Sequence, residues 1–210
     1  MKKTLIAVAA TLAATPALAH HPLAGAPMET FTHGVLSGVG HPILGFDHLF
    51  FIIAVGIAAA LTGRLLTAPL GYVAGMLGGV ALILGGIALP AVELVIALSL
   101  LIAGALLMSG RTLRLPIVMG LFGLLGLFHG WAFGQSLTGQ EGGAATAVIV
   151  GYLIGLAAIQ WPIAVAAGKT ASIAATAMPA RLAGGMVAGA GLFLVLEAAE
   201  GAAFAAIGLG

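Results

Sequence analysis

Apolar residues occupy most of the chain in long runs, separated by short stretches that contain charged residues, proline or polar clusters. A helix needs about 20 apolar residues to cross the hydrocarbon layer of a bilayer. Six runs approach that length, and we expect each to form one transmembrane helix, with bounds at 42–63, 68–89, 91–108, 116–135, 144–166 and 184–207. The hydrophobic pattern therefore predicts an all-α integral membrane protein, a bundle of six transmembrane helices.

The start of the chain has the three parts of a secretory signal peptide. Two lysines precede a short apolar run, and a small-x-small cleavage site, Ala17-Leu18-Ala19, follows that run. An uncleaved first helix is the alternative. With cleavage we expect a signal peptide at 1–19, a periplasmic N-terminal segment at 20–40 and the six-helix transmembrane domain at 41–210.

The basic residues give the orientation of the predicted helices. With the mature N-terminus outside, the loops after the first, third and fifth helices lie in the cytoplasm. These loops contain every lysine and arginine that remains after signal removal, namely Arg64, Arg111, Arg114, Lys169 and Arg181. This distribution satisfies the positive-inside rule, so both mature termini are expected to be extracytoplasmic.

Glycines spaced four residues apart indicate where the helices pack closely, because small residues let two backbones approach each other. Only Leu89-Pro90-Ala91 separates the second predicted helix from the third, which predicts a tight helical hairpin between them. The glycines with this spacing are Gly71, Gly75 and Gly79; Gly126, Gly130 and Gly134; Gly151 and Gly155; and Gly185 and Gly189.

Composition narrows the chemistry that the chain can carry. Hydrophobic residues make up 61% of the chain and charged residues 6%. The formal net charge is +1, and the lysines and arginines form no basic patch, which excludes a nucleic-acid partner. Cysteine is absent, so disulfides, thiolate metal sites and cysteine nucleophiles are excluded as well. A metal ion would have to be held by histidine, carboxylate, methionine or backbone groups.

Ionisable side chains are costly inside a membrane, and each is a functional candidate. Pro42 suits the first turn of a helix, where its missing N–H has no partner to lose. His41 and His48 would then lie about two turns apart on one face, with Asp47 about 100° round the helix from His48. Asp47 would also lie near the positive end of the helix dipole.

Helix rise places several of these groups at one depth. His48 is expected roughly 10 Å, and His129 in the fourth helix roughly 9 Å, inside the outer boundary. Glu93 at the start of the third helix, and Glu197 and Glu200 in the sixth, are candidates for metal ligands or a proton relay. The outer segment adds three candidates for metal capture, which are equally consistent with a terminus that binds nothing: His20, His21 and His33.

Imidazole and carboxylate ligands without thiolate suit Ni²⁺, Co²⁺, Cu²⁺ and Zn²⁺. We therefore hypothesise that a divalent metal ion enters from outside through a site near the outer membrane face, and that His129 is either a ligand or part of a hydrogen bond between helices. The predicted metal ligands are His41, Asp47, His48 and His129.

Two motifs resemble those of the HupE/UreJ family of nickel permeases. The stretch from His41 to His48 matches the pattern HPxxGxDH, and the stretch from Phe128 to Gly134 is similar to FHGxAHG, except that Phe133 stands where the family has a second histidine. Gln135 also replaces an acidic residue that often follows. The resemblance extends over essentially the whole chain.

This resemblance implies a multi-pass secondary permease of the bacterial inner membrane and not an enzyme. Its substrate would be Ni²⁺, with Co²⁺ as the second candidate, admitted from the periplasm without a permanent cofactor or an ATPase subunit. The metal would supply the maturation of a nickel enzyme such as hydrogenase or urease.

Two other functions use the same residues. In a zinc-dependent intramembrane hydrolase, His41, His48 and His129 would hold Zn²⁺ and the metal would activate water. A haem-binding electron carrier would need axial histidines and usually arginine near the propionates, and the predicted outer loops contain no arginine.

Overall fold

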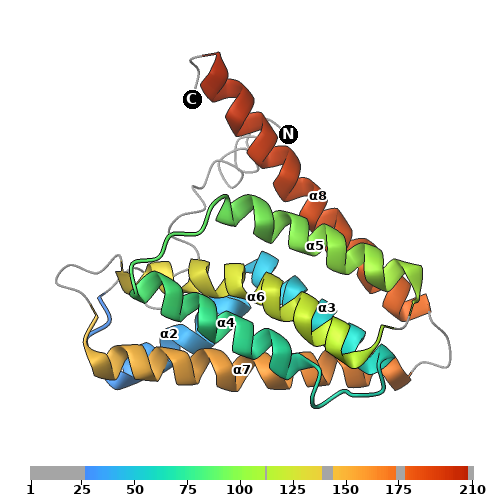
Figure 1. The fold of residues 1–210 in the computed structure, drawn as a ribbon, viewed down its shortest axis with the longest axis horizontal. Coiled ribbons are helices and arrows are strands. Elements are labelled where there is room, and N and C mark those ends of the chain that lie inside the picture. Colours follow the sequence, from blue (N-terminus) through green and yellow to red (C-terminus); the bar gives the residue numbers. More distant parts are fainter. Residues whose placement is uncertain (1–26, 112, 139–143, 174–177, 208–210) are drawn as a thin grey trace, which may run out of the picture.

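The computed structural model describes residues 27–111, 113–138, 144–173 and 178–207, and all regular secondary structure within them is helical (Figure 1). This confirms the all-α class. The predicted signal peptide, His20 and His21 lie outside the described residues. The helices are α2 (Phe31–Leu44), α3 (Phe46–Leu61), α4 (Pro69–Leu84), α5 (Val92–Ser109), α6 (Leu115–Thr138), α7 (Thr146–Ile173) and α8 (Met178–Ala206).

Four of the described helices, α5 to α8, are long and apolar enough to cross a membrane. A fifth span is formed if α2 and α3, which are bent by 80° at a short break, are taken together. Helix α4 is apolar but has 16 residues, a length of about 24 Å, which is short of the roughly 30 Å hydrocarbon thickness. The chain is thus a multi-pass helical membrane protein. Four of the six expected spans are single long helices, one is a bent pair of helices and one is a shorter helix.

The first predicted helix, 42–63, is wrong in its start and its continuity. Pro42 lies inside α2, which begins eleven residues earlier at Phe31 and is capped by the Thr30 side chain. The chain then leaves helical geometry at Gly45, with φ −81° and ψ 104°, and α3 begins at Phe46. A Cβ on Gly45 would lie 2.8 Å from Cδ2 of His48, so glycine leaves room for that ring at the break.

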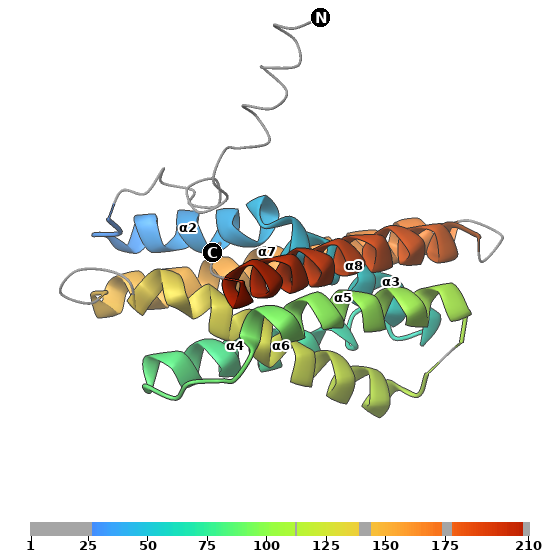
Figure 2. The same cartoon turned by 90° about the horizontal axis from the view of Figure 1, so that it is seen from above.

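The helices pack as three groups that do not follow chain order (Figures 1 and 2). Helix α4 packs on α6, α5 packs on α8, and α7 supports both α2 and α3. The predicted hairpin between the second and third helices is therefore wrong. The predicted helix 68–89 ends early, at Leu84, because Gly86 adopts a left-handed conformation with φ 76°. The N–H of Ile87 then bonds to the carbonyl of Leu82, the pattern of a Schellman cap.

The predicted glycine contacts hold for two of these groups. A Cβ on Gly75 of α4 would meet the Gly123 carbonyl of α6, and one on Gly155 of α7 would meet the carbonyl of Val35 in α2. In α8 the prediction is wrong for Gly189, since no described atom of another helix lies within 4 Å of a Cβ placed there. Gly184 instead contacts α5 closely, since a Cβ placed there would lie 2.8 Å from the carbonyl oxygen of Gly104.

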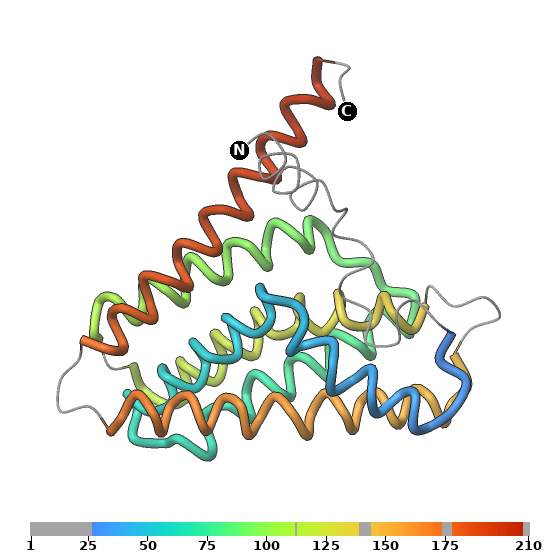
Figure 3. Tube along the Cα trace, turned by 180° about the vertical axis from the view of Figure 1, so that it is seen from behind, coloured from blue at the N-terminus to red at the C-terminus, as the bar shows by residue number. Residues whose placement is uncertain are grey.

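The basic residues gather at one end of the bundle. Arg64 lies between α3 and α4, and Arg111 and Arg114 lie between α5 and α6. Lys169 and Arg181 were expected in a loop but lie within the last turns of α7 and the first turn of α8. The ends of α5 and α7 and the starts of α6 and α8 meet on the right in Figure 1 and on the left in Figure 3. This common end is the arrangement expected from the positive-inside pattern.

Candidate metal-binding site

A partly open cavity of about 910 Å³ lies between the α2–α3 break, α5, α6 and α8. Figure 1 shows the α5–α8 pair inclined away from the other helices. We call this cavity the vestibule. Its lining contains two imidazoles and three carboxylates, those of His41, Asp47, His48, Glu93 and Glu197. The cavity therefore has the charge expected to attract cations.

The break at Gly45 gives the vestibule residues their positions. His41 lies in the last turn of α2, while Asp47 and His48 lie in the first turn of α3. The prediction that the two histidines share one helix face is therefore wrong, because they lie on different helices. The bend nevertheless brings their rings within 5.9 Å of each other, measured between centroids. The N-terminal end of α3 favours negative charge, which suits an ionised Asp47.

His48 and His129 form a direct imidazole pair. Their Nδ1 atoms are 2.8 Å apart, across helices α3 and α6. His48 is 6% exposed and His129 is fully buried, with its ring stacked on Phe51 at 4.2 Å. The two histidines thus lie side by side, but His129 lies behind His48 and does not line the vestibule.

Two hydroxyl groups that the sequence reasoning did not consider complete this network. Ser99 of α5 lies 2.9 Å from Nε2 of His129, and Tyr152 of α7 lies 3.1 Å from Nδ1 of His41. Ser136 also lies 3.1 Å from Nδ1 of His41. The sequence signal that could have identified Ser99 and Tyr152 is a hydroxyl group within an apolar stretch of a membrane helix.

Asp47 and His48 bring a carboxylate and an imidazole close together in the vestibule. Oδ2 of Asp47 lies 3.7 Å from Nε2 of His48, which is too long for a hydrogen bond. Two ligands with metal bonds of about 2.0–2.2 Å can be at most about 4.2 Å apart, so both atoms fit one ion. Within the described ranges no three histidine or carboxylate side chains converge tightly enough to hold a metal.

The other candidates divide between the vestibule and the surface. Glu93, in the first turn of α5, and Glu197 line the vestibule, whereas Glu200 does not. His33 lies near the start of α2, where its Nδ1 accepts a hydrogen bond of 3.3 Å from the N–H of Glu29. The structure thus brings the carboxylates of α5 and α8 toward Asp47 and leaves His33 apart.

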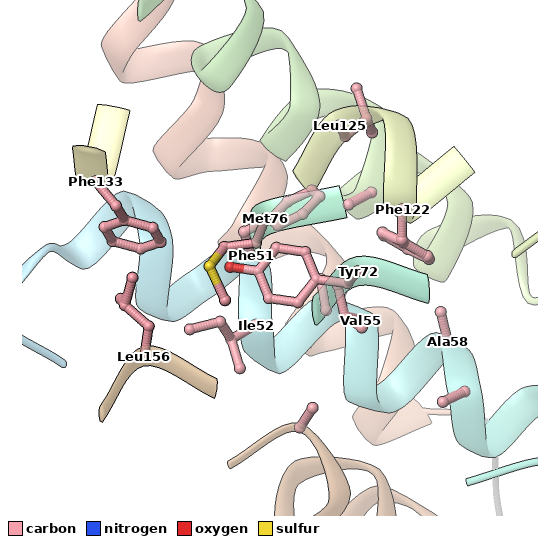
Figure 4. Close-up of a cluster of buried hydrophobic side chains, with 14 of the residues drawn as sticks. Phe51, Ile52, Val55, Ala58, Tyr72, Met76, Phe122, Leu125, Phe133 and Leu156 are labelled. Carbon is pink, nitrogen blue, oxygen red and sulfur yellow. The ribbon is translucent and has the colours of Figure 1, made fainter. Parts of the chain in front are cut away.

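Apolar rings pack directly against the imidazoles. The ring centroid of Phe133 lies 4.2 Å from that of His48 and 5.1 Å from that of His41, so this departure from the family motif packs a phenyl ring against both histidines. Phe51 packs against Tyr72 and Phe122, as Figure 4 shows. Gln160 of α7 is fully buried and accepts a hydrogen bond from the Tyr72 hydroxyl.

Comparisons with known proteins agree with the motifs. The family model described as HupE / UreJ protein matches residues 8–194. The chain is 34% identical over 206 residues to Protein HupE of Rhizobium leguminosarum bv. viciae, which covers 93% of this chain and 100% of the relative. No solved structure gives a significant match. The chain therefore belongs to the HupE/UreJ family.

Proposed function

We propose that the protein is a secondary permease that admits a divalent transition-metal ion, Ni²⁺ or alternatively Co²⁺, from the periplasm through the vestibule. The observation that carries this proposal is the convergence of Asp47 and His48, 3.7 Å apart, at the mouth of a broken membrane helix. Membership of a family commonly related to nickel and cobalt transport supports the choice of ion.

A site with few ligands in an open cavity suits transport. A site that surrounds an ion completely releases it slowly, and conduction requires binding that is favourable but reversible. Asp47 and His48 can replace part of the ion's hydration shell while water fills the remaining positions. His41 lines the same cavity and can join as the ion moves. Broken helices with ionisable groups at the break are a recurring design in transporters.

The charge of the vestibule gathers the substrate before it is bound. Three carboxylates face a cavity with apolar walls, and such a cavity concentrates field lines and raises the local cation concentration. No basic side chain is among its lining residues. The vestibule carboxylates of α5 and α8 would therefore act on the rate of capture, and Asp47 and His48 on the bound ion.

Glu197→Gln is expected to slow uptake at low metal concentration by about threefold at low ionic strength, with less effect as added salt screens the field. Glu200→Gln is the matched control, since Glu200 lies one turn further along α8 and does not line the vestibule. Initial uptake rates at two salt concentrations measure the effect. Equal rates for both variants at both salt concentrations would contradict electrostatic capture by the vestibule.

The cellular location and the use of the metal are proposed from membership of the family. We propose a location in the bacterial inner membrane, with the vestibule facing the periplasm and the basic end in the cytoplasm, where Lys and Arg are retained. The admitted ion would then serve the maturation of a nickel enzyme. The N-terminal His20 and His21 would help to capture metal once the signal peptide has been removed.

Reconstitution in proteoliposomes tests this function directly. Vesicles that contain the purified protein should accumulate Ni²⁺ or Co²⁺ in preference to Zn²⁺ and Cu²⁺, and repeating the assay with a pH gradient measures proton coupling. Vesicles that contain the His48→Ala variant provide the background. No metal flux above that background, together with turnover of lipid esters or amides by zinc-loaded protein, would favour the hydrolase alternative instead.

A further inference from the structure

The protonation of the buried imidazoles follows from hydroxyl groups whose protons are committed to backbone carbonyls. Oγ of Ser99 lies 2.7 Å from the carbonyl oxygen of Ile96, which can only accept a hydrogen bond. The single hydroxyl proton is therefore used there, and Oγ meets Nε2 of His129, 2.9 Å away, as an acceptor. His129 must carry its proton on Nε2.

The protonation of His129 in α6 fixes the protonation of His48 in α3 through the hydrogen bond between the two imidazoles. A neutral imidazole has one donor and one acceptor nitrogen, so Nδ1 of His129 presents a lone pair. Nδ1 of His48 lies 2.8 Å from it, and two lone pairs at that distance would repel each other. His48 therefore donates from Nδ1. In the neutral form that metal binding requires, the lone pair of His48 is on Nε2, the nitrogen that lies 3.7 Å from Asp47.

His41 shows the same arrangement through a second hydroxyl. The Tyr152 hydroxyl donates to the Phe133 carbonyl at 2.9 Å, and its oxygen lies 3.1 Å from Nδ1 of His41. Oγ of Ser136 lies 3.1 Å from the same Nδ1. Because the tyrosine proton is used on the carbonyl, a lone pair on Nδ1 would face the lone pairs of the tyrosine oxygen and be repelled. We therefore assign the proton to Nδ1 of His41, which both hydroxyl oxygens can accept. The lone pair of His41 is then also on Nε2.

We infer that Ser99 and Tyr152 are positioning residues that set the histidine tautomers for metal capture. They hold His41 and His48 with Nε2 as the metal-binding nitrogen, and they make His129 a hydrogen-bond acceptor that orients His48 and does not bind the ion. Metal-binding histidines are commonly held through their other ring nitrogen in this way, which fixes ring orientation and raises basicity. The inference rests on the proposed function for the identity of the ion.

Nitrogen NMR of the metal-free protein tests the tautomers. The full chain, labelled with ¹⁵N-histidine and reconstituted in lipid bilayers, should show protons on Nδ1 of His41 and His48 and on Nε2 of His129. Single His→Gln variants assign the signals. A proton on Nδ1 of His129 would overturn the inference. Zn²⁺, a diamagnetic probe, should then shift Nε2 of His48, and a shift at His129 in its place would overturn the ligand assignment.

Ser99→Ala separates positioning from packing. Without the hydroxyl, His129 should populate both tautomers, and the KM for metal uptake should rise about tenfold with little change in the maximal rate. Ser99→Thr retains a hydroxyl that can bond to the preceding turn and should restore both readouts. Ser109→Ala is the matched control, because Ser109 makes the same 2.7 Å bond to a carbonyl, that of Leu106, on the same helix, and among the described residues it has no hydrogen bond to a histidine.

The outcomes distinguish this inference from the proposed function. The protonation pattern is measured without metal, so a protein that transports no metal but shows the expected tautomers contradicts the transport proposal alone. Normal uptake with unchanged KM and unchanged tautomers in Ser99→Ala would contradict the positioning role alone.

Discussion

Replacing Asp47 or His48 by alanine is expected to abolish metal uptake, with a fall of more than about 100-fold at limiting metal, since even the hydrogen-bond partners of metal ligands are worth about 10–100-fold. Asp47 and His48 are the two ligand groups whose atoms fit one ion, 3.7 Å apart. Loss of either leaves a single ligand that cannot offset the removal of water from the ion.

Uptake of radioactive nickel by cells that make the protein at normal levels measures this effect. His33→Ala is the matched control, because His33 lies in α2 outside the vestibule. Asp47→Asn keeps the shape of the side chain and tests whether the charge matters. If His48→Ala cells took up metal as fast as His33→Ala cells, the vestibule would not be the site of capture.

Gly75→Val is expected to unfold or strongly destabilise the protein by separating α4 from α6. A Cβ at Gly75 would meet the backbone carbonyl of Gly123, and backbone cannot move aside as a flexible side chain can. Overpacking of a core costs about 1–3 kcal/mol when side chains can adjust, so a clash with backbone should cost at least that much. The same helix pair holds Tyr72 and His129 near each other, so the site should be lost as well.

Gly78→Val is the control for this change. Gly78 lies on the same helix, and apart from the adjoining turns of α4 no described atom lies within 4 Å of a Cβ placed there. Both variants gain the same β-branched residue, so the difference between them reports packing and not helix propensity. Thermal stability in detergent, followed by size-exclusion chromatography, measures the effect. Equal melting temperatures would contradict close contact between α4 and α6.

Long apolar runs predicted α5 to α8, because the cost of exposing polar backbone to lipid acts on every segment separately. The bounds of α5 and α6 lie within three residues of the prediction, whereas α7 ends seven residues later and α8 begins six residues earlier than predicted. The bounds predicted for the helices at 42–63 and 68–89 are wrong because single glycines interrupt or end the helices there. Gly45 accommodates the ring of His48 at a helix break, and Gly86 adopts a left-handed conformation that ends α4. In a chain with 33 glycines, no pattern of hydrophobicity distinguishes the few that end a helix.

Composition and neighbouring residues along the chain are enough to predict the helical membrane class, the gathering of basic residues at one end and the motif that holds His41, Asp47 and His48. In contrast, the position of His129 behind His48 and the contacts of Ser99 and Tyr152 with the imidazoles follow only from how the helices pack. These hydrogen bonds join residues 81, 30 and 111 positions apart in the sequence. Contacts across such separations depend on which helices pack together, and here α4 packs with α6, α5 with α8, and α7 with the broken pair α2 and α3.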